Sequence, residues 1–177
     1  KTTSEGIAEY RKMLADGNPA ELFEAKGEEL WKTRRGPKNA SLEQCDLGQG
    51  PGKVKGAFVQ LPRYFADTNR VQDLESRLLT CMQNLQGFDA AVIAKTPFGR
   101  DEQNNIESLV AFISTESRGM KMNLPTAHPQ EKAMYEVGKR AFFYRAGPYD
   151  FSCATCHGED GKRIRLQDLP DLTGNRS

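Results

Sequence analysis

The sequence predicts a mainly α-helical protein that contains two tandem modules. Three observations predict this architecture. Apolar residues recur at helical spacing in several segments, as Leu74, Leu78 and Cys81 do. Two parts of the chain align without a gap at an offset of 111 residues, which places Gly27 on Gly138. The chain has 177 residues, which is long enough for two small domains.

The N-terminal half is expected to alternate helices with one long loop. Helices are expected over about residues 4–16 and 20–34, with a break at Gly17-Asn18-Pro19 between them. The stretch 47–66 is rich in Gly and Pro and is expected to be a loop. A helix over 70–86 follows, since Leu74, Leu78, Cys81 and their neighbours Val71 and Leu85 share one face.

The C-terminal half is expected to begin after a linker. Apolar residues at helical spacing predict a helix around 106–113. We expect one domain over residues 1–118, a linker over 119–129 and a second domain over 130–177. A helix over about 130–145 opens the second domain.

The repeat covers several residue types that are not expected to coincide often. The matched pairs are Gly27 with Gly138, Trp31 with Phe142, Arg34 with Arg145, Gly36-Pro37 with Gly147-Pro148, Cys45 with Cys156, and Gly50 with Gly161. Chance agreement of common residues is the alternative. The match of a cysteine within an ungapped alignment favours a true repeat.

The second module carries the motif Cys153-Ala-Thr-Cys156-His157. C-x-x-C-H is the attachment motif of c-type haem, in which two thiols bond to the porphyrin vinyl groups and the histidine binds the iron. A zinc half-site is the alternative, but it would need further ligands. The remaining candidates, Cys45, Cys81 and His128, lie far away in the sequence. We therefore expect one covalent haem c, held by Cys153 and Cys156, with His157 as the proximal ligand.

The first module lacks two of the three haem-binding residues. At the same offset, Leu42 stands in the place of Cys153, and Asp46 stands in the place of His157. The expected fold is therefore two tandem cytochrome c-like modules, of which the first holds no haem.

Composition and cysteine use restrict the setting of the protein. The formal net charge is +1, so nothing indicates nucleic acid as a partner. No apolar run approaches the ~20 residues of a membrane span, so no membrane partner is expected. Haem attachment to this motif takes place outside the bacterial cytoplasm, which indicates the periplasm. The chain starts at Lys1 without Met, as expected of a processed form.

Two cysteines remain after the haem motif, Cys45 and Cys81. Cys81 lies on the inward face of its helix, so it can be a buried thiol or one half of a disulfide with Cys45. An oxidising compartment favours the disulfide.

Several blocks resemble the SoxA subunit of the thiosulfate-oxidising SoxAX cytochromes. They are Cys45-Asp-Leu-Gly-Gln-Gly-Pro-Gly, Leu61-Pro-Arg-Tyr-Phe-Ala-Asp-Thr, Val71-Gln-Asp-Leu-Glu-Ser-Arg-Leu, Cys81-Met, Arg145-Ala-Gly-Pro, and the haem motif followed by Gly158. The resemblance implies the mono-haem type of the family. It also implies a small SoxX-like c-type cytochrome partner, a SoxYZ-like sulfur carrier, and thiosulfate as substrate. The implied activity is that of a sulfur transferase of the L-cysteine S-thiosulfotransferase type, which couples thiosulfate oxidatively to a carrier cysteine.

The resemblance also implies a cysteine thiolate as the second axial ligand of the haem. Cys81 is its counterpart in the first module, and 81 + 111 gives position 192, beyond Ser177. We therefore expect the second module to be truncated and the catalytic cysteine to lie outside these residues. Within the chain the candidate sixth ligands are His128, Met120 and Met122.

Two smaller expectations concern the surroundings of the haem. The backbone carbonyl of Leu169 or Pro170 is expected to accept a hydrogen bond from the His157 ring. Lys162, Arg163 and Arg165 are either a basic rim for the thiosulfate dianion or part of a solvated loop.

The alternative function is a mono-haem electron-transfer cytochrome with a structural N-terminal domain. His/Met ligation and a high reduction potential would favour this carrier, whereas a thiolate ligand and a low potential would favour the enzyme. A weaker alternative is a scaffold for the partner cytochrome.

Overall fold

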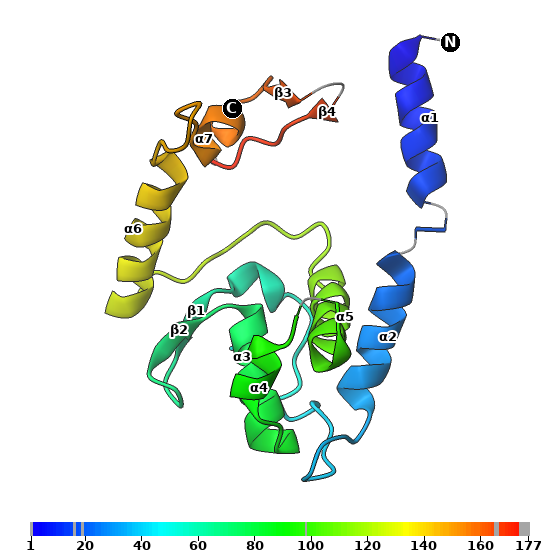
Figure 1. Ribbon diagram of the computed structural model, residues 1–177, viewed down its shortest axis with the longest axis vertical. Helices are drawn as coiled ribbons and strands as arrows, with labels where there is room; N and C mark the ends of the chain where they lie inside the picture. The colour runs from blue at the N-terminus through cyan, green and yellow to red at the C-terminus, as the bar shows by residue number, and fades with distance from the viewer. Residues whose placement is uncertain (1, 16, 19, 98, 165–166, 174–177) are drawn as a thin grey trace. The chain divides into compact units, whose positions relative to one another are not determined.

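The computed structural model describes residues 2–15, 17–18, 20–97, 99–164 and 167–173 (Figure 1). The chain divides into two compact units, which we call the first unit (Lys1–Pro125) and the second unit (Thr126–Ser177). Their boundary falls inside the 119–129 segment that was expected to be a linker.

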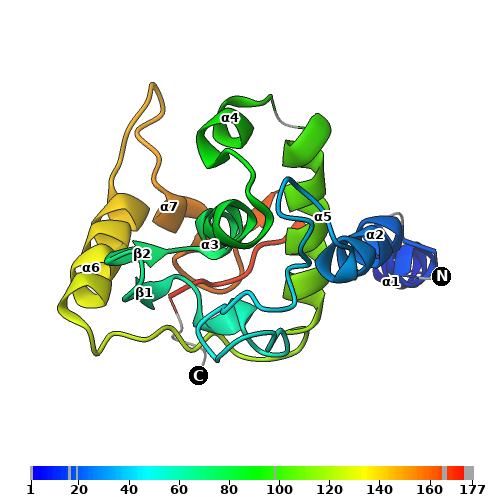
Figure 2. The same ribbon diagram turned by 90° about the horizontal axis from the view of Figure 1, so that it is seen from below.

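The first unit begins with the two expected helices, α1 (Thr3–Ala15) and α2 (Ala20–Lys32). Helix α2 packs against α5 (Asp101–Thr115), and Figure 2 shows the two helices alongside each other. Gly27 allows this close contact, because a Cβ atom at that position would lie 2.0 Å from the backbone oxygen of Ser108. An ion pair from Arg35 to Glu102 also connects the end of α2 to α5.

The segment expected to be one loop and one long helix contains a hairpin. A 3-10 turn, η1 (Phe58–Gln60), precedes strands β1 (Arg63–Phe65) and β2 (Arg70–Gln72). The strands pair antiparallel, with Arg63 opposite Gln72. The expectation of a helix from residue 70 is therefore wrong at its start.

Helix α3 (Leu74–Cys81) begins only after Asp73, whose side chain accepts a hydrogen bond from the Ser76 backbone N–H. This cap marks the N-terminus, because it satisfies a donor that no helical carbonyl can reach. A π-helical turn, η2 (Met82–Gln86), continues α3 and ends at Gly87 with φ of 81°. Val71 thus belongs to a strand, while Leu74, Leu78 and Cys81 are buried on the helix as expected.

The core of the first unit is formed by side chains from α2, the loop after it, β1, α3, η2, and two further helices, α4 (Ala90–Lys95) and α5. The short helix α4 lies between η2 and α5, and the apolar spacing of the sequence did not reveal it. Its N-terminus is capped by Asp89, which accepts from the N–H groups of Ala91 and Val92. The core side chains include Trp31, Leu42, Leu47, Phe65, Leu78, Met82, Ile93, Ile106, Leu109 and Ile113.

The second unit contains the expected helix α6 (Pro129–Phe143), the short helix α7 (Cys153–His157), and a small hairpin of β3 (Arg163–Ile164) and β4 (Gln167–Asp168). Helix α6 starts at a capping box, in which the His128 ring accepts from Gln130 N–H and the Glu131 carboxylate accepts from His128 N–H. In the described ranges, none of the helices combines the length and apolar character that crossing a membrane requires.

Candidate haem site and disulfide

The motif residues Cys153, Cys156 and His157 all lie on α7, a helix of five residues. Ser152 caps its N-terminus, and Gly158 follows its last residue. Both cysteines are free thiols; Cys153 is exposed and Cys156 is half-buried. Because the two cysteines are three residues apart, one helical turn brings both thiols to the same side, as attachment to one macrocycle requires.

The ring of His157 is oriented by a backbone carbonyl. Its Nδ1 atom lies 3.0 Å from the carbonyl oxygen of Pro170, one of the two residues indicated by the sequence. Since a carbonyl only accepts, Nδ1 carries the proton, and Nε2 keeps the lone pair that an iron ligand needs. The Leu172 N–H also donates to the His157 carbonyl at 2.9 Å, so the 170–172 segment holds both the ring and the backbone of this residue.

The second unit exposes apolar side chains instead of burying them. Phe151, Ile164 and Leu172 are 58%, 54% and 61% exposed, and the buried residues described in this unit are the polar Glu131 and Asp171. A large apolar group such as a porphyrin would give such side chains a surface to pack on. The free thiols, the oriented imidazole and these side chains together fit a haem c.

A zinc site is poorly supported by the same residues. Among the side chains that the structure describes, no cluster of three or more His, Cys, Asp and Glu is arranged to hold a metal ion. Two of the three remaining candidates for zinc ligands, Cys45 and Cys81, are joined to each other in a disulfide.

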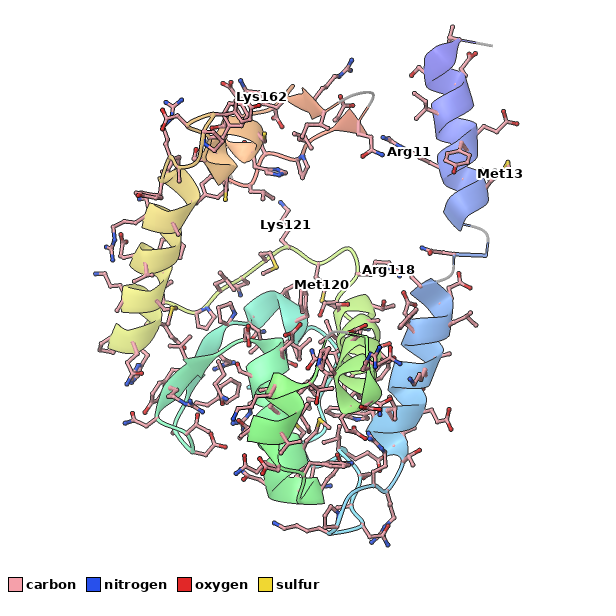
Figure 3. All side chains as sticks on the ribbon, in the orientation of Figure 1. Arg11, Met13, Arg118, Met120, Lys121 and Lys162 are labelled. Atoms are coloured by element: carbon pink, nitrogen blue, oxygen red, sulfur yellow. A yellow bond between two sulfur atoms is a disulfide. The ribbon has the colours of Figure 1, made fainter. Side chains whose placement is uncertain are left out.

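The basic residues after the haem motif are paired with acids. Lys162 forms an ion pair with Glu159 at 2.7 Å, and Arg163 donates to Asp168 at 2.5 Å. The hydrogen bond to Glu159, and then its charge, raise the pKa of Lys162. The Lys162 side chain is labelled in Figure 3. These pairs reduce the positive charge available to a dianion, which favours the solvated-loop alternative for both residues. Arg165 lies outside the described residues.

The candidate sixth ligands within the chain have other surroundings. His128 caps α6 through its Nδ1 atom, which accepts from Gln130 N–H. Met120 and Met122 lie in the extended segment at the end of the first unit and are 42% and 57% exposed.

The first unit contains the expected disulfide. Cys45 and Cys81 are bonded, with 5.6 Å between their Cα atoms, and they are 1% and 5% exposed. The bond connects the loop after α2 to the end of α3, the helix whose inward face the sequence had indicated. Within the repeat, Cys45 stands at the position that corresponds to Cys156 of the second unit.

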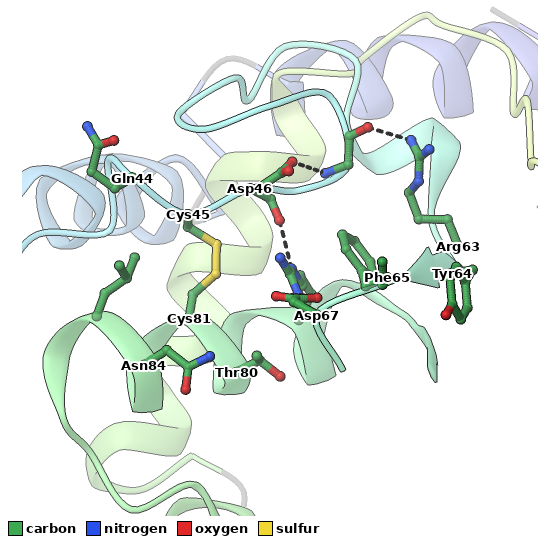
Figure 4. A pocket seen from close by; sticks show the side chains of 14 residues that line it. Gln44, Cys45, Asp46, Arg63, Tyr64, Phe65, Asp67, Thr80, Cys81 and Asn84 are labelled. Atoms are coloured by element: carbon green, nitrogen blue, oxygen red, sulfur yellow. Dashed lines mark hydrogen bonds and ion pairs between the residues drawn. A yellow bond between two sulfur atoms is a disulfide. The ribbon is translucent and has the colours of Figure 1, made fainter. Parts of the chain in front are cut away.

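A cavity of about 470 Å³ lies beside this disulfide, between the 44–48 loop, the hairpin and α3 (Figure 4). Asp46, at the position that corresponds to His157, points its carboxylate back into its own loop. Its Oδ1 atom accepts from the N–H groups of Gly48 and Gly50 at 2.6 and 2.9 Å. The residue is thus used to shape the loop.

Arg77 lines this cavity and was not expected from the sequence. It is only 5% exposed, its Nε donates to the Asp46 carbonyl at 2.7 Å, and its Nη1 donates to both carboxylate oxygens of Asp67. Its guanidinium stacks 3.9 Å from the centre of the Phe65 ring. The only sequence signal is the spacing of Arg77 between Leu74 and Cys81, which places it near the inward face of α3.

The two units share local backbone geometry at the repeat positions. An isolated bridge joins Arg35 to Ala40 in the first unit, and another joins Ala146 to Phe151, 111 residues later, in the second. Within these turns, Gly36 and Gly147 have φ values of 72° and 79°, and Asn39 and Asp150 have φ values of 46° and 50°.

One side-chain contact repeats as well. The Arg34 Nε donates to the Asn39 carbonyl at 2.8 Å, and the Arg145 Nε donates to the Asp150 carbonyl at 2.9 Å. The turn before each cysteine is therefore locked in the same way in both units.

Comparison with known proteins gives consistent matches. The family described as the SoxA/TsdA cytochrome c domain matches residues 26–122. The L-cysteine S-thiosulfotransferase subunit SoxA of Hydrogenophilus thermoluteolus is 60% identical over 94% of this chain and 61% of its own length. The corresponding subunit of Hydrogenobacter thermophilus is 34% identical over 85% of this chain and 55% of its own length.

A solved structure shows the same similarity in three dimensions. The crystal structure of SoxXA from P. pantotrophus superposes with a TM-score of 0.67 and 27% identity, over 88% of this chain and 55% of that one. The chain therefore spans between about half and three fifths of the length of these relatives.

Proposed function

The chain belongs to the SoxA/TsdA cytochrome c family, and on this basis we propose that it is the haem c subunit of a complex that couples thiosulfate oxidatively to a cysteine of a carrier protein. The observation that carries the proposal is the site on α7. Two free thiols and an imidazole with a free Nε2 share one helical turn, and Pro170 fixes the ring.

The proposed reaction balances when an acceptor takes up two electrons. A carrier thiolate and the outer sulfur of thiosulfate form a sulfur–sulfur bond, which gives a carrier S-thiosulfonate and releases two electrons. A haem held by Cys153, Cys156 and His157 would supply one-electron redox chemistry for this step. A SoxX-like c-type cytochrome, the kind of partner that the SoxXA structure contains, would receive the electrons.

The residues of the second unit have separate tasks in this proposal. Cys153 and Cys156 would hold the haem covalently, and His157 would bind its iron through Nε2. Pro170 keeps the proton on Nδ1, which leaves the lone pair of Nε2 for the iron. The number of haems is one, because in the first unit Leu42 and Asp46 occupy the matching positions and Cys45 is in a disulfide.

The two units are tandem cytochrome c modules in this proposal, the first without haem. The paired bridges and the paired arginine contacts support it, since they recur at the offset of the sequence repeat. The first unit then serves as a disulfide-stabilised structural domain. The setting is the periplasm, where haem attachment and disulfide formation both take place.

The experiment that tests the proposal follows the carrier protein. The holo-subunit, with its cytochrome partner, is mixed with thiosulfate and a reduced SoxYZ-like carrier. We expect the carrier to gain the mass of one S-thiosulfonate while the partner haem becomes reduced, and we expect His157→Ala to abolish both. Reduction of the partner without any change in carrier mass would favour the electron-carrier alternative. Unchanged carrier modification by His157→Ala would refute the assigned role of the site.

A further inference from the structure

The helical turn that carries the haem motif is held by side chains that belong to neither the cysteines nor the histidine. Ser152 Oγ accepts from the Thr155 N–H at 3.2 Å, and Thr155 Oγ1 accepts from the Ser152 N–H at 2.9 Å. These reciprocal bonds form a capping box at the first turn of α7. Both hydrogen bonds form between residues of the chain, without a bound haem.

This box fixes the geometry of the two thiols. Cys153 is the first residue of α7, where helices fray unless the free N–H groups have acceptors. Cys156 lies one turn later, and the contacts of His157 with Pro170 and Leu172 hold the far end of the helix. The box therefore holds the Cys153 end of the turn, while these contacts hold the His157 end.

The first unit offers a natural comparison, because the same offset maps Ser152 onto Ser41 and Thr155 onto Gln44. Ser41 Oγ donates to the Glu43 carboxylate at 3.0 Å, and residues 42–46 form no helix. The capping box thus accompanies the pair of haem-binding cysteines, and a different local structure accompanies the disulfide.

We propose that Ser152 and Thr155 are positioning residues for covalent haem attachment. They present both thiols to one porphyrin at the same time, so that the second thioether bond forms before the turn opens. This inference rests on the proposed function, because it requires that α7 receives a haem.

The test compares two substitutions at one position in the full chain, secreted from a host that attaches haem c. Thr155→Val removes the acceptor and keeps the branched shape, whereas Thr155→Ser keeps the acceptor. Intact mass gives the fraction with haem, and the pyridine haemochrome band distinguishes one thioether bond from two. We expect Thr155→Val to lower the ratio of two-bond to one-bond product about fivefold, the effect of one lost hydrogen bond at the start of the helix. Thr155→Ser should stay near the wild-type ratio.

A second pair of variants checks the other half of the box. Ser152→Ala should behave as Thr155→Val does, and Ser152→Asp should restore attachment because aspartate is also a good cap. Amide exchange of α6, which lies in the same unit as the substitutions, checks that each variant is folded.

The outcomes separate the two proposals. A Thr155→Val protein with the wild-type ratio overturns the positioning role and leaves the haem site intact. A wild-type protein without covalent haem overturns the proposed function and this inference together.

Discussion

The Cys45–Cys81 disulfide is expected to supply a large share of the stability of the first unit. The perturbation is the double substitution Cys45→Ala and Cys81→Ala, which removes the bond without adding a polar atom to the core. The two residues are 36 positions apart in sequence. In the chain-entropy model, a closed loop of this size lowers the entropy of the unfolded chain by an amount worth about 4 kcal/mol at 25 °C.

The assay uses the single tryptophan of the chain. Trp31 is 4% exposed and lies in the core with both cysteines, so its fluorescence reports the unfolding of the first unit. Urea titrations of the full chain should show a loss of about 4 kcal/mol in the free energy of unfolding. The matched control, Cys153→Ala with Cys156→Ala, is compared with the haem-free wild-type chain. It also removes two sulfurs but leaves the disulfide, and it should not shift the Trp31 transition.

The reasoning would be refuted if the double variant lost less than about 1 kcal/mol, since that is the size of an ordinary core substitution. Such a result would mean that the hydrophobic core around Trp31 and Leu78 holds the unit without the cross-link.

Three further predictions concern single residues. Gly27→Ala should destabilise the first unit by about 2–3 kcal/mol in Trp31-monitored urea unfolding, because its Cβ would lie 2.0 Å from a backbone oxygen of α5. At its repeat counterpart, Gly138, a Cβ atom would meet nothing within 4 Å. Gly138→Ala should therefore be tolerated or add up to about 1 kcal/mol of helix stability, measured as slower amide exchange in α6. Equal losses of stability in Gly27→Ala and Gly138→Ala would contradict the packing argument. Arg77→Met should cost about 2 kcal/mol in the same unfolding assay, and Arg77→Lys should not restore it, because a lysine cannot replace Nε and Nη1 together. His157→Ala should change the ligation bands of the haem spectrum while the thioether bonds remain, and an unaltered spectrum would exclude His157 as the iron ligand.

The sequence was sufficient for the features whose determinants lie close together in the chain. The helical turn of the C-x-x-C-H motif, the break after α1, the helices α2 and α6, and the inward face of α3 all depend on residues within a few positions of one another. The disulfide partner of Cys45 could also be inferred, because few cysteines remained. The sequence also predicted that the carbonyl of Leu169 or Pro170 would contact the His157 ring, because both residues lie close to it in the chain. The carbonyl of Pro170 makes this contact.

The sequence was insufficient where distant segments compete for the same residues. Residues 70–72 have helical apolar spacing, but they form β2, since β1 offers them hydrogen-bond partners and Asp73 begins the helix later. The role of Arg77 likewise depends on Asp46, which is 31 positions away, and on the Phe65 ring. No local pattern encodes such a contact.

The sequence by itself therefore determined which residues match a haem-attachment motif, which cysteines can form a cross-link, and which family the chain resembles. Tertiary structure alone decided how the first unit uses the positions that match a haem site. There, Cys45 is bonded to Cys81, Asp46 shapes its own loop, and Arg77 is buried against both the loop and the hairpin. The physical reason is that a covalent motif needs only local spacing, whereas a buried charge needs partners from several segments that meet only when the chain has folded.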